Sequence, residues 1–149
     1  MMDQSCILQV EDDENDVFFL QHAFKVAGLK TLLQVTRDGE EAIHYLSGAR
    51  AFADRTQYPV PRLIILDLKM PRKSGFEVLQ WLRHQSDVPH LPVIVFSSSA
   101  QPGDIDRAYE LGANSFIVKP SCMEKRVHLA ALIKDYWLQF NEAPAVRRR

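Results

Sequence analysis

Five side chains suited to phosphate and metal chemistry follow short apolar runs of this sequence. They are, in chain order, Glu11, Asp12, Asp67, Ser97 and Lys119. Crowded carboxylates raise each other's pKa values unless a cation intervenes, and a hard divalent ion such as Mg²⁺ takes oxygen ligands. Asp67 can accept a phosphoryl group as an acyl phosphate. Lys119 can pair with a phosphate oxygen, and the hydroxyl of Ser97 can hydrogen-bond to one.

These side chains can act together only if the fold brings the ends of the apolar runs to one place. The runs predict five strands, at residues 6–10, 32–36, 63–66, 93–96 and 115–118. Apolar residues at helical spacing predict a helix after each strand. This alternation implies an α/β fold of the flavodoxin-like, doubly wound type, with five helices around a parallel sheet of order 2-1-3-4-5. In that order, neighbouring strand ends converge on one crevice.

Capping residues mark several helix boundaries. Asn15 and Asp16 can cap the first helix, Gly28 suits the position just past its end, and Pro102 suits the first turn of the fourth. The last helix carries an apolar stripe of Leu129, Leu132, Ile133, Tyr136, Trp137 and Phe140. The stripe is longer than a five-stranded sheet requires, so a core role and a partner or dimer surface both stay open.

Length and linker composition predict one domain. Residues 1–149 contain no internal repeat and no linker to a second domain. The domain is predicted to have its core at about residues 5–140 and a tail at 141–149. Residues 49–61 lack a clean period and predict a connection that is mostly loop and longer than usual.

Composition excludes several classes of protein. A formal net charge of −1 gives no indication of binding to nucleic acid or a membrane, and Arg147–Arg149 is interpreted as a solvated tail. No apolar run approaches the roughly 20 residues that span a bilayer. Met1–Gln4 lacks the pattern of a signal peptide. Cys6 and Cys122 are too few for a disulfide framework and are interpreted as reduced thiols of a cytoplasmic protein.

Six motifs together identify a family. They are V-E-D-D at 10–13, L-D-L-K-M-P at 66–71, S-G at 74–75, Ser97, G-A at 112–113 and F-I-V-K-P at 116–120. Each is weak alone, but their order and spacing resemble the receiver domains of bacterial two-component response regulators. Neither a P-loop motif nor a G-x-S-x-G motif occurs, so those rival ways to handle phosphate or acyl groups are not indicated.

The resemblance implies a role for each site residue. Asp67 would be phosphorylated, Asp12 would bind Mg²⁺ directly, Glu11 would bind it mostly through water, and the backbone carbonyl of Lys69 would be a further ligand. Lys119 would pair with the phosphoryl group.

The resemblance also implies a switch. Ser97 would move toward the phosphoryl group and Phe116 would change rotamer, which would alter the face made by the fourth helix, fifth strand and fifth helix. The Lys119–Pro120 peptide bond would be cis.

The sequence departs from the commonest family pattern at Glu11, Ser97 and Phe116, where aspartate, threonine and tyrosine are frequent. The long connection at 49–61 and the aromatic last helix resemble single-domain regulators that partner phytochrome histidine kinases. A phytochrome-type sensor kinase is therefore the expected phosphodonor.

The resemblance implies a phosphorylation switch with no turnover of an external substrate. Output would pass by protein contact, or by phosphate transfer to a histidine phosphotransfer or effector protein, and a homodimer stays open. An adaptor that works without phosphorylation is the alternative, although no acid, lysine or acceptor is lost. A true phosphatase needs a second acid two residues after the nucleophile, where this chain has Lys69.

Overall fold

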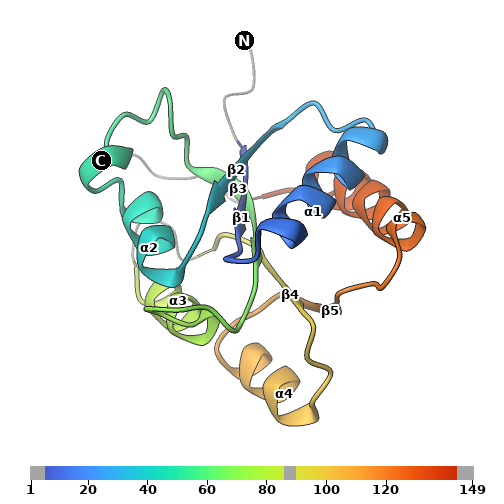
Figure 1. The fold of residues 1–149 in the computed structure, drawn as a ribbon. Coiled ribbons are helices and arrows are strands. Elements are labelled where there is room, and N and C mark those ends of the chain that lie inside the picture. The colour runs from blue at the N-terminus through green and yellow to red at the C-terminus, as the bar shows by residue number, and fades with distance from the viewer. Residues whose placement is uncertain (1–5, 86–89, 144–149) are drawn as a thin grey trace.

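The computed structural model describes residues 6–85 and 90–143, which form a five-stranded parallel sheet between two layers of helices (Figure 1). The strands are β1 (Cys6–Val10), β2 (Leu32–Thr36), β3 (Pro61–Leu66), β4 (Val93–Ser97) and β5 (Ser115–Val118). Their order is β2-β1-β3-β4-β5, so the predicted flavodoxin-like topology is confirmed. The predictions for Met1–Gln4 and Arg147–Arg149 lie outside the described residues.

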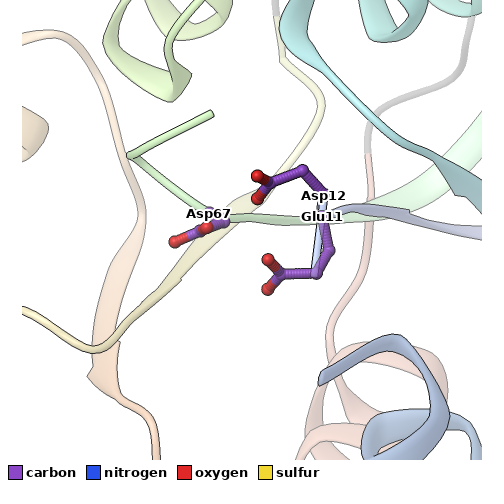
Figure 2. Close-up of side chains that lie close together, drawn as sticks. All are labelled: Glu11, Asp12 and Asp67. Atoms are coloured by element: carbon purple, nitrogen blue, oxygen red, sulfur yellow. The ribbon is translucent and has the colours of Figure 1, made fainter. Parts of the chain in front are cut away.

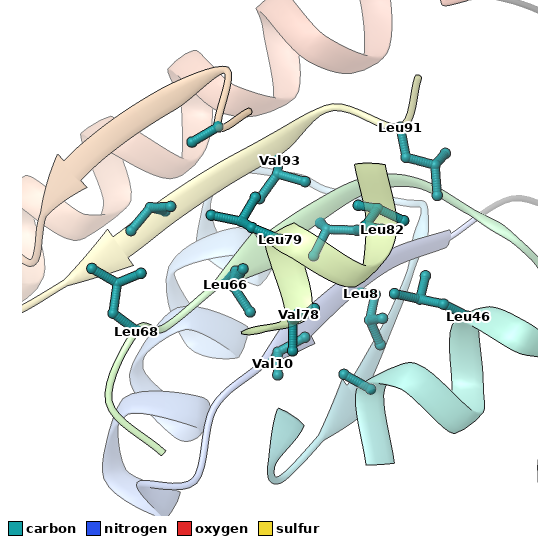
Figure 3. Packing of buried hydrophobic residues seen from close by; sticks show 14 of the residues in the cluster. Leu8, Val10, Leu46, Leu66, Leu68, Val78, Leu79, Leu82, Leu91 and Val93 are labelled. Atoms are coloured by element: carbon teal, nitrogen blue, oxygen red, sulfur yellow. The ribbon is translucent and has the colours of Figure 1, made fainter. Parts of the chain in front are cut away.

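The central strands are buried on both faces because alternate residues pack into two separate clusters. In β1, Leu8 and Val10 belong to one cluster and Ile7 belongs to the other. In β3, Ile64 belongs to the first cluster and Ile65 to the second. Figure 3 shows part of the first cluster, with side chains from the strands packed against those of helices. Continuous apolar strands are the expected result of helices on both faces.

Two helical layers cover the sheet (Figure 1). α1 (Glu14–Val26) and α5 (Met123–Ile133) pack on one face. α2 (Gly39–Ser47), α3 (Gly75–Arg83) and α4 (Pro102–Glu110) pack on the other. No helix among the described residues is long and apolar enough to cross a membrane.

The predicted cap of α1 is wrong. Asp13 is the N-cap residue, and its carboxylate accepts hydrogen bonds from the amides of Asn15 at 2.8 Å and Asp16 at 3.2 Å. The N-cap residue must leave the helical conformation, and Asp13 does so with φ −83° and ψ 114°. The side chain of Asp16 is therefore released for contacts elsewhere. Gly28 follows the helix with φ +85°, as predicted.

The last helix changes its geometry partway along the predicted stripe. α5 ends at Ile133 and continues as the π-helix η2 (Lys134–Phe140), in which the amide of Asn141 donates to the carbonyl of Tyr136 at 2.7 Å. The stripe is also divided between two faces. Leu129, Ile133 and Trp137 pack on the sheet, whereas Leu132, Tyr136 and Phe140 are exposed.

The connection at 49–61 is mostly loop, as predicted, but it is anchored. It contains the 3₁₀ turn η1 (Arg50–Phe52). The guanidinium of Arg55 donates to the carbonyls of Tyr45 at 2.8 Å and Leu46 at 2.9 Å, which satisfies the end of α2. β3 begins at Pro61, two residues before the predicted start, because proline is compatible with the first position of a strand.

The loop that follows β3 depends on close approach at Gly75. The amide of Gly75 donates to the carbonyl of Leu68 at 2.9 Å, and the Leu68 side chain is fully buried. A Cβ atom on Gly75 would collide with the carbonyl oxygen of Asp67 and would lie 2.8 Å from the Cα of Leu68. Glycine is therefore required here, and the close contact fixes the backbone that carries Asp67.

Substituting Gly75 by alanine should destabilise the fold, because backbone atoms on both sides of the contact would have to separate. We expect Gly75→Ala to lower the free energy of unfolding by about 1–3 kcal/mol in urea denaturation. Gly103→Ala is the matched control, since nothing lies within 4 Å of a Cβ atom there and Gly103 is in α4. That control should be neutral or stabilising by up to about 1 kcal/mol. Equal effects at the two positions would contradict the close-contact account.

Candidate functional site

Three carboxylates meet at the carboxyl edge of the sheet. Glu11 and Asp12 follow β1, Asp67 follows the adjacent strand β3, and one oxygen from each lies within 4.8 Å of the others (Figure 2). The strand ladder continues into the site, because the amide of Asp67 donates to the carbonyl of Val10 at 3.0 Å. Glu11 and Asp67 are buried and Asp12 is exposed, so the cluster can be approached from the side of Asp12.

Lys119 lies at the centre of the polar contacts. Its ammonium group donates to Glu11 Oε1 at 2.7 Å and to Asp16 Oδ2 at 2.8 Å, and it lies 3.8 Å from Asp67 Oδ1. The Lys119 side chain is only 8% exposed. The same Asp67 oxygen accepts the amide of Leu68 at 2.9 Å. One buried cation is therefore shared by three acids.

Asp16 was not predicted to belong to the site. The sequence interpretation placed it among the capping residues, but Asp13 caps the helix and Asp16 reaches Lys119. The available signal was an acid within the first turn of the helix that follows Glu11 and Asp12. That signal was insufficient, because first-turn acids are common wherever they stabilise the helix macrodipole.

Burial dominates the electrostatics of the cluster. It raises the pKa of Glu11 from 4.5 to about 7, although the hydrogen bond from Lys119 opposes the shift. Burial also raises the pKa of Asp67. For Lys119, burial would lower the pKa, but hydrogen bonds to Asp16 and Glu11 outweigh it and the pKa is raised. The acids are therefore incompletely neutralised by Lys119, and an additional positive charge would stabilise them.

The cluster fits a divalent metal ion. Its ligand atoms are carboxylate oxygens, which hard cations prefer, and its acids carry more negative charge than the single lysine compensates. Lys69, whose backbone carbonyl was a predicted ligand, lies two residues beyond Asp67 in the same loop and is exposed.

The two predicted switch residues lie on the neighbouring strands. Ser97 ends β4 and is buried, and its hydroxyl oxygen accepts the amide of Ser99 at 3.1 Å. A serine hydroxyl that accepts one hydrogen bond can still donate its hydrogen to a phosphate oxygen. Phe116 lies on β5, is half-buried and packs against the cluster covered by α2, α3 and α4.

The predicted cis peptide bond is wrong. No cis peptide bond occurs in residues 6–85 and 90–143, so the Lys119–Pro120 bond is trans. Trans is the lower-energy isomer of a bond before proline by about 0.5–1 kcal/mol, so local sequence alone does not favour cis. The carbonyl of Pro120 accepts a hydrogen bond from Arg126 Nε at 3.1 Å.

The raised pKa of Glu11 predicts that metal binding depends on pH. A carboxylate holds a metal ion, directly or through a bound water, more strongly when it is deprotonated, and the pKa of Glu11 is about 7 rather than 4.5. Affinity for Mg²⁺, measured by calorimetry, should therefore rise about tenfold between pH 6 and pH 8. In Glu11→Gln the affinity should be weaker and nearly independent of pH over that range. The same slope in both proteins would show that another group titrates.

The same shift links Glu11 to stability. Because its folded-state pKa lies above 4.5, protonation of Glu11 stabilises the fold below pH 4.5, and this contribution is lost as the pH rises through 7.

Comparison with known proteins identifies relatives over most of the chain. Residues 7–131 match the family model of the response regulator receiver domain. The probable methanogenesis regulatory protein FilR2 of Methanothrix harundinacea is 32% identical over 146 residues, covering 95% of this chain and 89% of FilR2. Response regulator Rcp1 of Synechocystis is 31% identical over 139 residues, covering 93% of this chain and 92% of Rcp1.

Solved structures of other proteins superpose on this fold over most of its length. The Mn²⁺-bound form of Rcp1 superposes with a TM-score of 0.84 at 30% identity, covering 95% of this chain and 99% of that one. The phosphorylated cyanobacterial phytochrome response regulator RcpA superposes with a TM-score of 0.87 at 30% identity, covering 96% of this chain and all of RcpA. A divalent ion and a phosphoryl group are thus found in proteins that share this fold.

Proposed function

We propose that this chain, which belongs to the response regulator receiver family, is a phosphorylation switch in which Asp67 is the phosphoacceptor. Receivers are the phosphoacceptor components of two-component signalling. Asp67 is assigned as the phosphoacceptor because of its position. It is a buried carboxylate with Glu11 and Asp12 beside it and the Lys119 ammonium 3.8 Å away.

The proposed step is transfer from a phosphohistidine of a sensor kinase. An oxygen of the Asp67 carboxylate attacks phosphorus, the phosphorus–nitrogen bond breaks, and the imidazole leaves with the electron pair and then takes up a proton. The product is an acyl phosphate on Asp67. Lys119 pairs with an oxygen of the transferred group, and the hydroxyl of Ser97 donates a hydrogen bond to another.

Mg²⁺ is the proposed cofactor, held by Asp12, Asp67, Glu11 through water, and the carbonyl of Lys69. When bound, it neutralises charge on the carboxylates and the phosphate oxygens. The raised pKa values of Glu11 and Asp67 support this choice, because both acids would be stabilised by a nearby cation.

The proposed output is a change of surface rather than turnover of a substrate. Ser97 moves toward the phosphoryl group and Phe116 changes rotamer, which alters the face made by α4, β5 and α5. Tyr109 and Val118 on this face are 48% and 44% exposed, so a change there is accessible to a partner protein. On this proposal the chain is one receiver domain without enzymatic turnover.

Phosphorylation should add one phosphate to the protein. Incubation with Mg²⁺ and acetyl phosphate should increase the intact mass by about 80 Da. Asp67→Asn should show no gain, because the amide oxygen is a poor nucleophile. Asp106→Asn is the control, since Asp106 is an exposed acid on α4, and it should be labelled like the parent. No gain in the parent with several phosphodonors would favour the alternative, an adaptor that works without phosphorylation.

A phytochrome-type histidine kinase is the proposed phosphodonor, which implies a cytoplasmic location. The similarity to the phytochrome regulator RcpA supports this choice. The exposed ring of Phe18, on the helix that begins at the site, is the proposed contact for the kinase. A histidine phosphotransfer or effector protein is proposed downstream. The exposed Leu132, Tyr136 and Phe140 offer an apolar contact surface for such a protein or for a second copy.

The kinase contact can be separated from the chemistry. Phe18→Ala should slow phosphotransfer from a purified phytochrome kinase but leave labelling by acetyl phosphate unchanged, because the small donor needs no docking surface. Phe140→Ala, which alters an aromatic ring on η2 that is 76% exposed, should transfer like the parent. A sensor kinase of another class that labels the parent equally fast would contradict the phytochrome pairing.

A further inference from the structure

Asp16 connects the site to the junction between α1 and α5 through two ion pairs. One carboxylate oxygen, Oδ2, accepts from the ammonium of Lys119 at 2.8 Å. The other, Oδ1, accepts from Arg126 Nη2 at 3.3 Å. The Asp16 side chain is 20% exposed and that of Arg126 is 10% exposed, so both pairs are largely shielded from solvent. Asp16 therefore forms ion pairs with both a lysine of the site and a buried arginine.

Lys119 already shares its single positive charge between Glu11 and Asp16, so a phosphoryl group on Asp67 would compete with both acids for it. An ammonium group has three donors, and two are directed at Glu11 and Asp16. Asp67 lies at 3.8 Å, beyond hydrogen-bond distance. One donor remains free, and attraction of the ammonium toward an oxygen on phosphorylated Asp67 would lengthen the contact with Glu11, the contact with Asp16, or both.

Arg126 can accept the carboxylate that Lys119 leaves. Its Nε donates to the carbonyl of Pro120 at 3.1 Å, which holds the guanidinium in place beside the site. Its Nη1 is buried without a hydrogen-bond partner among the described residues. An unsatisfied buried donor is unfavourable, so a closer, bidentate contact with Asp16 would satisfy it.

Arg126 also contacts two aromatic rings, one of which is partly exposed at the surface. The guanidinium lies 5.4 Å from the ring centre of Phe19 on α1 and 5.8 Å from that of Phe96 on β4. Phe19 is 37% exposed. A shift of Arg126 toward Asp16 would therefore change its packing against a residue that a partner protein can contact.

We propose that Asp16 is a positioning residue for the phosphoryl-transfer site. In the unphosphorylated protein, the carboxylate of Asp16 holds Lys119 away from Asp67. When Lys119 moves to the phosphoryl group, the same carboxylate forms a closer ion pair with Arg126. Asp16 and the phosphoryl group thus compete for one lysine, and Arg126 favours the phosphorylated state by taking the released carboxylate. The inference rests on the proposed role of Asp67 and adds a determinant of how readily that state forms.

The competition predicts effects of opposite sign at Asp16 and Arg126. The probe is beryllofluoride, a phosphoryl mimic, titrated at fixed saturating Mg²⁺ by calorimetry. Asp16→Asn removes the competitor and should tighten binding about threefold to fivefold, the upper end of the range for exposed ion pairs, because this pair is largely shielded from solvent. Arg126→Met leaves Asp16 wholly to Lys119 and should weaken binding by a similar factor.

Two comparisons separate positioning from a general charge effect. Glu14→Gln removes an exposed acid from the same first turn of α1, so its effect is subtracted from that of Asp16→Asn. In the double variant Asp16→Asn with Arg126→Met, the effect of the Arg126 change should fall below about twofold, because its partner is absent. Asp16→Asn that binds no tighter than Glu14→Gln, or an undiminished Arg126 effect in the double variant, overturns the proposal.

A measurement on the unaltered protein is independent of whether the variants fold. The Nε–H resonance of Arg126, whose proton is donated to Pro120, should shift in NMR spectra on addition of beryllofluoride with Mg²⁺. An unchanged resonance while beryllofluoride binds overturns the handover to Arg126 but leaves the role of Asp67 intact. No binding of beryllofluoride by the parent protein instead contradicts the proposed function, and with it this inference.

Discussion

The burial of Glu11 and Asp67 beside a single lysine is the constraint on which the rest of the site depends. Two carboxylates removed from water at the end of adjacent strands repel one another, and burial raises the pKa of each. Lys119 relieves this repulsion only in part, because it also pairs with Asp16. The site therefore favours added positive charge, which a divalent ion would supply, and it places the carboxylate of Asp67 close to the ammonium of Lys119.

The fold maintains this unfavourable arrangement by anchoring the backbone on both sides of it. Apolar residues on both faces of β1 and β3 hold the strands that deliver the acids, and the buried side chain of Leu68 fixes the loop after Asp67. Gly75 then brings α3 against that loop at a distance no other residue permits. Strain and repulsion at functional sites are tolerated where surrounding packing compensates for them.

The sequence predicted the sheet well, because apolar runs bounded by acids, serines and prolines mark buried strands directly. The predicted strand order placed the ends of β1 and β3 side by side, and this was enough to predict that Glu11, Asp12 and Asp67 lie close together. The role of Asp16 could not be predicted, because it depends on Asp13 taking the cap, a choice set by local backbone geometry. The linear pattern also contained no signal for the π-helical geometry at Lys134–Phe140. The trans bond at Pro120 is the local preference, and the expectation of a cis bond came only from the family resemblance.

The most direct measurement of the central claim is chemical identification of the phosphorylated residue. Sodium borohydride reduces an aspartyl phosphate to homoserine, so the protein is phosphorylated with Mg²⁺ present, reduced, digested and sequenced by mass spectrometry. The account predicts homoserine at position 67 and aspartate at position 12. Homoserine at Asp12 or at any other acid, or its absence from a protein shown to carry phosphate, would contradict the assignment of Asp67.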